Sequence, residues 1–431
     1  MKTAVLVIIV PLLAKEGLGE VDCDPPLPRR VNEGGNEMTP GAASVERFLD
    51  YLNSRELLLR LNWEDWLAIT PPYRDTGFSI NEVTVRYKRN GYDWDMHGSV
   101  YTPEKEVNGE RAFVVFHGGA GSEKIMDLAP DGRPGLARVL AAQGFKVMTL
   151  TYPGHYPPGG VWKIPVAGRM PIYLLDQELS KEEILDRNLK CGFNTILQGA
   201  GLLTDEHLAG REILAFGHST GGPMAAHLCR FSKKAKVIGL VGFGSGGPDG
   251  WRKEWRDKTG AEKYREIPIE KISRRSPDTF REARYEDPQD LTPWGGAEEY
   301  IRLVSPIRSQ MKTSLCDNQH NPAVGILDEY AKRTGLPREE YFDHLQEPDP
   351  NWLRTIRVLL LVGENDHGHW VKGERPEDKR EMFMGAKFAA TTQGAHVVLI
   401  PRYGHVGYAE LHNEKIVYLW LWAVKSGYFD S

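Results

Sequence analysis

The sequence Gly217-His-Ser-Thr-Gly221 places a serine hydroxyl where it could act as a nucleophile. The apolar run 213–216 before it predicts a short buried strand, and the small residues after it favour a helix. A G-x-S-x-G sequence at such a junction is typical of a sharp turn that exposes its serine. Gly217 and Gly221 lack Cβ atoms, so they allow the close approach of strand and helix that the turn requires. Ser219 is therefore the predicted nucleophile.

Ser219 needs a base, because a serine hydroxyl is a poor nucleophile until its proton is removed. His405 follows a predicted strand at 396–400, and Asp366 follows a predicted strand at 356–362. The imidazole of His405 could accept the serine proton and return it to a leaving group, while Asp366 could orient the imidazole. All three groups would lie past the carboxyl ends of parallel strands, where ligands gather in an open α/β sheet.

Neighbouring side chains leave alternatives open for both partners. Glu364 lies two residues before Asp366, but we expect it to face away or to cap a turn. His396 begins a predicted strand and is expected to pack there. The other histidines close enough in sequence to be considered as the base are His367, His369 and His412.

Backbone N–H groups could stabilise the oxyanion that forms when a serine attacks a carbonyl. One donor is expected from Thr220, directly after the nucleophile. The second is expected from the loop 117–121, which follows an apolar run at 112–116, with Gly119 as the first choice and Gly118 as the second. Each such donor contributes about a hundredfold or more in rate. The alternative interpretation of this loop is a simple glycine-rich turn.

Aromatic side chains could line an apolar pocket for a small-molecule substrate. Because tryptophans more often only pack in a core, this indication is weaker than the motif at Ser219. We expect a medium-sized, largely uncharged ester. The candidate pocket residues are Trp162, Tyr173, His218, Trp251 and Trp255, with Trp294 as a further aromatic residue in the same region as the last two.

The elements that would position these groups alternate between strands and helices. An antiparallel hairpin, 80–87 and 92–101 around the Asn90-Gly91 turn, is expected to lead the sheet. After it, unbroken apolar runs separated by helical patterns predict a mostly parallel sheet covered on both faces. The expected strands of that part are 112–116, 145–151, 213–216, 237–243, 356–362 and 396–400, and the expected helices are 135–143, 193–203, 378–391 and 414–424.

Composition divides the 431 residues into a core and several additions. Before the hairpin, apolar residues from Ser44 to Ile69 recur at helical spacing and predict one or two amphipathic helices. Charge, prolines and tryptophans interrupt the strand–helix rhythm in the middle of the chain. We therefore expect a leader at 1–43, an N-terminal helical segment at 44–79, an α/β core at 80–247 and 353–431, and a mostly helical cap insertion at 248–352.

The beginning of the sequence leaves the compartment open. Lys2 precedes an apolar run, 4–14, that fits the central part of a signal peptide at 1–19 and is too short to span a membrane. No later segment is long and apolar enough for a transmembrane helix. The choice between a secreted and a cytoplasmic protein stays open, as does the oligomeric state.

Charge, cysteines and a second glycine motif bear on other function classes. The net charge of −5 gives no basic footprint for nucleic acid, and mixed charge at 251–286 is typical of a solvated helix face. Four widely spaced cysteines argue against a zinc site or a disulfide scaffold.

The run 242–247 satisfies G-x-G-x-x-G, the pattern of a dinucleotide-binding oxidoreductase, but Pro248 follows where a helix should begin. We therefore expect no cofactor and no metal.

Four segments together resemble the α/β-hydrolase superfamily. The resemblance implies an α/β-hydrolase fold, a cap at the insertion, and serine-dependent hydrolysis of an ester, amide or thioester through an acyl-enzyme. A carboxylesterase is the first expectation, with an acyltransferase, lactonase, amidase or peptidase on the same triad as alternatives. The chain departs from the family in lacking a full His-Gly-Gly-Gly and in its added N-terminal helical segment. The matching segments are His117-Gly-Gly-Ala-Gly121, Gly217-His-Ser-Thr-Gly221, Gly363-Glu-Asn-Asp366 and Gly404-His405.

Overall fold

The structure is a computed structural model of the chain. Residues 1–38 of the expected leader, the expected cap insertion at 248–352 and the expected helix at 378–391 lie outside the residues that it describes. Those residues are 39–56, 58–118, 123–129, 132–153, 165–166, 170–171, 193–219, 221–244, 356–363, 395–404 and 407–430.

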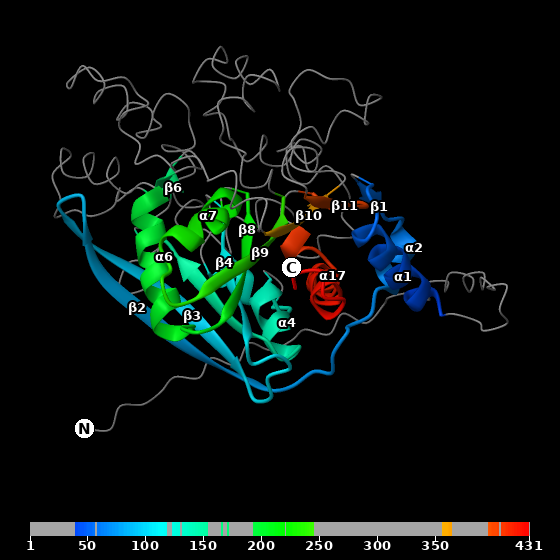
Figure 1. Cartoon of the computed structure of the whole chain (residues 1–431), viewed down its shortest axis with the longest axis horizontal. Helices are drawn as coiled ribbons and strands as arrows, with labels where there is room; N and C mark the ends of the chain where they lie inside the picture. Colours follow the sequence, from blue (N-terminus) through cyan, green and yellow to red (C-terminus); the bar gives the residue numbers. More distant parts are fainter. Residues whose placement is uncertain are drawn as a thin grey trace, which may run out of the picture.

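A nine-stranded sheet is the centre of the described part, in the order β1-β11-β10-β9-β8-β4-β5-β3-β2 (Figure 1). Its pairs are parallel from β1 to β5, whereas β3 pairs antiparallel with both β5 and β2. This confirms the expected mostly parallel sheet with an antiparallel hairpin. The strands are β1 (Leu59–Arg60), β2 (Phe78–Arg89), β3 (Tyr92–Pro103), β4 (Arg111–Phe116), β5 (Lys146–Thr151), β8 (Glu212–His218), β9 (Lys236–Phe243), β10 (Arg357–Gly363) and β11 (His396–Ile400). A separate ribbon pairs β6 (Pro165–Val166) with β7 (Met170–Pro171).

Helices cover both faces of the sheet, as Figure 1 shows, with α4 and α17 on one side and α6 and α7 on the other. Strand alternation explains this: along β8, Leu214 and Phe216 enter one apolar core, while Ile213 and Ala215 enter the other. In the described ranges, no helix is long and apolar enough to cross a membrane. The helices are α1 (Pro40–Leu52), α2 (Trp63–Ala68), α3 (Lys124–Asp127), α4 (Leu136–Ala142), α6 (Phe193–His207), α7 (Gly221–His227) and α17 (Glu414–Lys425), with 3-10 turns η1 (Leu228–Arg230) and η6 (Gly407–Ala409).

The hairpin forms around the predicted turn. Asn90 and Gly91 adopt φ values of 52° and 83°, and the two strands pair from Arg89 opposite Tyr92 onward. A two-residue turn with both residues left-handed matches the twist of the strands that it joins. The hairpin prediction is therefore confirmed, with each strand slightly longer than expected.

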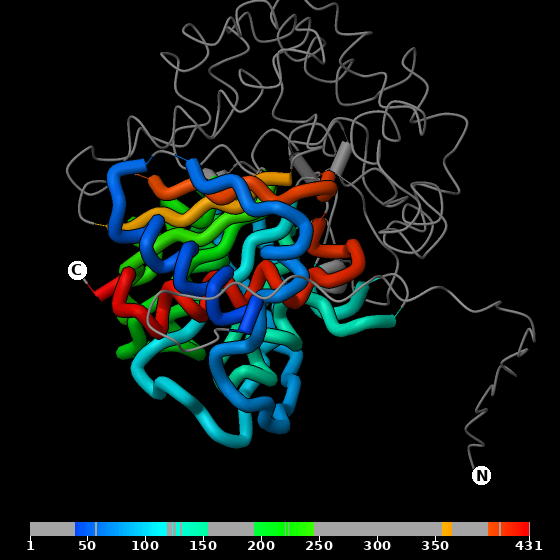
Figure 2. Tube along the Cα trace, turned by 90° about the vertical axis from the view of Figure 1, so that its right-hand side faces the viewer, coloured from blue at the N-terminus to red at the C-terminus, as the bar shows by residue number. Residues whose placement is uncertain are grey.

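The N-terminal segment differs from its prediction at one point. Helical spacing through Leu59 suggested only helices, but Leu59–Arg60 form β1, which pairs parallel with β11 opposite Val398 and Leu399. An edge strand presents unpaired backbone N–H and C=O groups, and β1 satisfies part of the β11 edge. Figure 2 shows this blue segment running along the orange strands and beside the red α17. Helical periodicity could not reveal a strand whose partner lies more than 300 residues away.

Candidate active site

Ser219 occupies the sharp turn that the sequence predicts. It follows β8 directly, with α7 beginning at Gly221, and its φ of 51° lies in the left-handed region. A non-glycine residue there is strained by about 1 to 3 kcal/mol and persists only where the surroundings impose it. The Ser219 carbonyl accepts a 3.1 Å hydrogen bond from the Gly222 N–H, which ties the turn to the first residues of the helix.

Two glycines make the turn possible because no side chain would fit in their place. A Cβ at Gly217 would lie 2.5 Å from the Gly221 carbonyl carbon, and a Cβ at Gly221 would lie 2.5 Å from the Phe116 carbonyl oxygen. Real Cβ atoms essentially never come that close. The helix α7 is thus pressed against both its own strand and the end of β4. The predicted role of Gly217 and Gly221 in close approach is confirmed.

The loop after β4 lies directly against the nucleophile. A Cβ at Gly118 would be 2.6 Å from His218 Nδ1 and 3.2 Å from Ser219 Cβ, so only glycine fits at this point. His117 is fully buried, its ring stacks on Tyr152 with centroids 3.8 Å apart, and its carbonyl accepts a 2.7 Å hydrogen bond from the Tyr152 hydroxyl. Burial raises the pKa of Tyr152 well above its usual value, so the phenol stays protonated and keeps donating.

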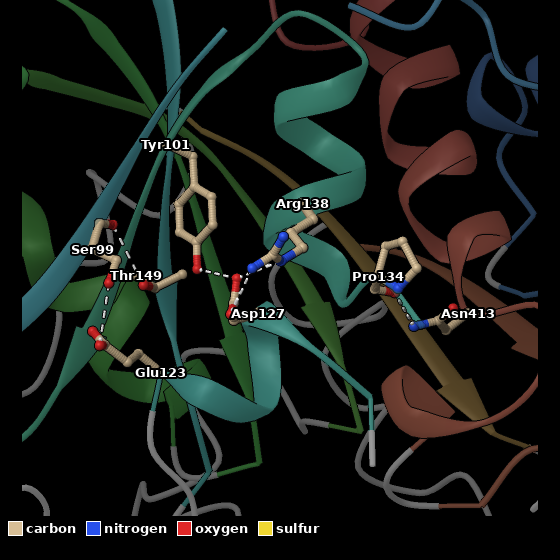
Figure 3. Close-up of polar contacts among 8 residues, drawn as sticks. All are labelled: Ser99, Tyr101, Glu123, Asp127, Pro134, Arg138, Thr149 and Asn413. Atoms are coloured by element: carbon tan, nitrogen blue, oxygen red, sulfur yellow. Dashed lines mark hydrogen bonds and ion pairs between the residues drawn. The ribbon is translucent and has the colours of Figure 1, made fainter. Parts of the chain in front are cut away.

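The far end of the same loop is held by a polar cluster, most of which is drawn in Figure 3. The Ser99 hydroxyl donates to Glu123 Oε1 at 3.2 Å, and the Glu123 backbone N–H donates to Thr151 Oγ1 at 2.9 Å. One turn further, Asp127 accepts from the Tyr101 hydroxyl at 2.9 Å and from Arg138 Nε at 2.8 Å. Described residues therefore anchor the predicted oxyanion loop at both of its ends.

The strand ends that precede the predicted acid and base lie side by side. Gly363 ends β10, three residues before Asp366, and pairs with Ile400 at the end of β11. A Cβ at Gly363 would lie 2.6 Å from the Gly404 carbonyl oxygen, and Gly404 directly precedes His405. This backbone contact brings the two predicted loops to a common starting point.

The chain after His405 meets the elbow. The Tyr408 ring packs edge-on against His218 with centroids 4.6 Å apart, and a Cβ at Gly407 would lie 2.9 Å from the ring of Phe243 at the end of β9. His218 directly precedes Ser219. Gly404, before position 405, thus contacts the end of β10, and Tyr408, after it, contacts the end of β8.

Two polar side chains hold the segment that follows His405 from outside. Arg133 donates to the carbonyl oxygens of Glu410 at 2.8 Å and Ala409 at 2.9 Å. Asn413 donates to the Tyr408 carbonyl at 2.8 Å and to the Pro134 carbonyl at 3.2 Å, the second of which Figure 3 shows. The connection between α3 and α4 therefore ties the oxyanion-loop side of the site to the base side.

Two of the alternative histidines are accounted for by packing. His396 begins β11, its Nδ1 lies 2.8 Å from the Tyr428 hydroxyl, and burial lowers its pKa. His412 precedes α17 and packs edge-on against Trp63, and burial lowers its pKa as well. The expected packing role of His396 is confirmed.

The structure brings together Ser219, His218 and Gly118 among the predicted site residues. Sequence reasoning missed Arg133, Asn413 and Tyr152, whose partners are backbone carbonyls distant in sequence and leave no motif. Outside the described residues lie Asp366, His405, Thr220, Gly119, Trp162, Tyr173, Trp251, Trp255 and Trp294, as well as the alternatives Glu364, His367 and His369.

Comparisons with known proteins identify a family. The model of the alpha/beta hydrolase family matches residues 113–417, and no curated protein matches the chain. Among solved structures, a probable hydrolytic enzyme from Pseudomonas aeruginosa PAO1 is similar at 16% identity over 78% of this chain and 93% of that chain, with a TM-score of 0.42. A bacterial membrane phospholipase A is similar at 14% identity over 80% and 86%, with a TM-score of 0.43. The esterase RhEst1 from Rhodococcus sp. ECU1013 is similar at 16% identity over 82% and 99%, with a TM-score of 0.40.

Proposed function

Because the chain belongs to the alpha/beta hydrolase family, we propose that it is a serine hydrolase that cleaves a medium-sized, largely uncharged carboxylic ester. Ser219 is the nucleophile, His405 is the general base and Asp366 orients the base. Thr220 and Gly119, or Gly118 in its place, donate backbone N–H groups to the oxyanion. The reaction needs no cofactor or metal in this scheme.

The observation that carries the proposal is the backbone of Ser219. A left-handed serine between a buried strand and a helix, with glycines on both sides, has no packing purpose that glycine would not serve better. Ser219 follows the carboxyl end of β8, its Cβ lies against Gly118, and its neighbour His218 packs on Tyr408. Strain stored at such a position is typical of functional sites.

The chemistry follows in two balanced halves. His405 takes the Ser219 proton as the oxygen attacks the ester carbonyl, and the backbone donors stabilise the negative charge that develops on the carbonyl oxygen. The carbon–oxygen bond of the ester then breaks, and His405 returns the proton to the leaving alcohol. Water repeats the same steps on the acyl-enzyme and releases the acid and free Ser219.

Fluorophosphonate labelling with peptide mass spectrometry tests the proposal, run beside turnover of a p-nitrophenyl ester series. We expect stoichiometric labelling at Ser219, and in Ser219→Ala both labelling and turnover are lost, the latter by about 10⁴-fold or more. Asp366→Asn and His405→Asn are expected to fold and to lose most of the turnover. Added alcohols should not compete with water for the acyl group if the protein is a hydrolase rather than an acyltransferase.

The Thr39→Ser variant is a suitable control, because Thr39 only caps α1 through its hydroxyl and serine keeps that bond. It should label and turn over like the wild type. Well-folded protein that is not labelled at Ser219, or Ser219→Ala protein that still turns over esters, would refute the proposed mechanism.

A further inference from the structure

The N-terminal unit, defined as residues 40–69 with α1, β1 and α2, packs on the edge of the sheet that leads to the predicted base. Its Tyr51 hydroxyl bridges the backbone N–H and C=O of Val397 in the middle of β11, at 2.7 and 2.9 Å. Its α2 reaches further along, to the end of the strand. Figure 2 shows the unit in blue beside β11 and α17.

Helix α2 contacts both ends of the base segment, defined as residues 403–411. At the entry, the Trp66 indole N–H donates to the Tyr403 hydroxyl at 3.2 Å, and the Arg402 guanidinium lies 4.7 Å above the Trp63 ring. Beyond the exit, Trp63 packs edge-on against His412 with centroids 6.1 Å apart. One short helix therefore holds the chain before and after the base segment.

Tyr403 closes the base segment on itself. Its hydroxyl accepts from Trp66 and donates to the Leu411 carbonyl, so one buried phenol joins the first and last residues of the segment. Both Trp66 and Tyr403 are fully buried, and their rings meet edge-on with centroids 5.3 Å apart. Burial raises the pKa of Tyr403 well above its usual value, so the phenol remains a donor over the whole working range of pH.

The same tyrosine also meets the strand that leads to the predicted acid. Its backbone carbonyl lies against Gly363, close enough that no Cβ would fit at that glycine. A displacement of Tyr403 would therefore move the chain that leads to His405 relative to the end of β10, which leads to Asp366. Misplacement by about 1 Å can cost up to a hundredfold in rate when a group must act at hydrogen-bond distance.

We propose that Tyr403 and Trp66 are positioning residues for the catalytic base, and that helix α2 of the N-terminal unit thereby supports the active site. The inference rests on the proposed function, because it takes His405 as the base. It assigns a role to the segment by which this chain departs from the minimal family pattern.

The test compares three conservative variants in the full-length protein. Tyr403→Phe removes both hydrogen bonds of the Tyr403 hydroxyl. Trp66→Phe puts a smaller ring in place of the indole, which removes the bond to Tyr403 and leaves the bond from Tyr403 to Leu411. Tyr51→Phe is the matched control, because it removes an equally buried hydroxyl of the same unit that bonds to the middle of β11. We measure kcat and KM for a p-nitrophenyl ester, the second-order rate of fluorophosphonate labelling, and the urea midpoint of each variant.

We expect Tyr403→Phe to lower kcat and the labelling rate about tenfold with KM within twofold. Trp66→Phe should lower both rates about threefold, since one of the two hydrogen bonds remains. Tyr51→Phe should lower the urea midpoint as much as Tyr403→Phe but leave kcat and labelling within twofold of the wild type. If Tyr403→Phe does not fold, the comparison of Trp66→Phe with Tyr51→Phe decides.

Equal rates in Tyr403→Phe, Trp66→Phe and Tyr51→Phe, at whatever stability, would overturn the inference and leave the proposed function intact. Failure of the wild type to label at Ser219 is a different result and counts against the proposed function instead. The two failures are therefore distinguishable in one set of measurements.

Discussion

The elbow at Ser219 and the base segment 403–411 border the same site but are held in place by opposite means. The elbow depends on missing side chains, since a Cβ at Gly217 or Gly221 would clash with backbone atoms. The base segment depends on side chains that reach in from elsewhere, including Trp66, Arg133 and Asn413. Close backbone packing thus holds the strained turn in place, whereas hydrogen bonds from other segments hold the base segment in place.

This difference predicts two patterns of tolerance to mutation. A position that has no room for a methyl group responds to substitution in an all-or-none way, because the clash is with backbone. A segment held by several hydrogen bonds responds in steps, because each bond contributes about 0.5 to 3 kcal/mol. The predictions below test that contrast.

The largest effect is expected at the elbow glycines. Gly217→Ala and Gly221→Ala each force a Cβ against backbone atoms, so we expect about 3 kcal/mol less unfolding free energy and at least about a hundredfold slower labelling at Ser219. Gly109→Ala is the control, because the nearest atom to its Cβ would be 3.6 Å away. Urea unfolding and labelling kinetics measure both quantities. A Gly217→Ala variant with wild-type stability and labelling rate would contradict the idea that backbone packing holds the elbow in place.

A graded effect is expected at Arg133. Arg133→Ala removes donors to the Ala409 and Glu410 carbonyls and should lower the unfolding free energy by roughly 2 to 3 kcal/mol, with a fall in kcat. Arg133→Lys should recover part of both, because an ammonium keeps the charge but cannot reproduce the guanidinium fork. Arg86→Ala, which removes an exposed pair with Asp95, should change little. Equal losses in the alanine and lysine variants would contradict a graded response.

Acid is expected to weaken the elbow side through His227, at the end of α7. Burial lowers the pKa of His227 from its usual 6.5 to about 3. Between pH 6.5 and pH 3, His227 is therefore protonated in the unfolded chain but neutral in the folded chain. The free energy of unfolding consequently falls as the pH is lowered. Between pH 7 and 5 this amounts to about 2 kcal/mol.

Urea midpoints at the two pH values measure this loss in the wild type and in His227→Gln, which should lack most of it. His412→Gln is the comparison on the base side, where the half-exposed ring should contribute less. A wild-type loss that survives in His227→Gln would show that the acid sensitivity lies elsewhere.

The smallest effect separates strain from chemistry at Ser219 itself. Ser219→Ala and Ser219→Gly both remove the hydroxyl, but only glycine is at ease with a φ of 51°. We expect the glycine variant to be more stable than the alanine variant by about 1 kcal/mol, with neither labelled. Calorimetry or urea unfolding measures the difference. Alanine as stable as glycine would mean that the turn relaxes and stores no strain.

The sequence alone was sufficient for every strand of the nine-stranded sheet except β1, for most of the helices and for the elbow. Unbroken apolar runs such as 112–116 and 213–216 can only be buried strands in this context, and Asn90-Gly91 has few alternatives to a tight hairpin turn. The pattern G-x-S-x-G predicts where the strained turn lies, because the glycines that permit the turn stand two residues before and after the serine. These signals are local, so they can be read without knowing what surrounds them.

Only the tertiary structure decided what supports the site. Leu59 pairs with a strand 339 residues further along the chain, as its register with Val398 shows, and helical spacing gave the wrong state for it. Trp66 meets Tyr403, and Arg133 meets the carbonyls of Ala409 and Glu410, through contacts between segments that share no motif. The packing of the whole chain determines such partners. Every residue has a backbone carbonyl, so the sequence does not indicate which carbonyl a given side chain will bind.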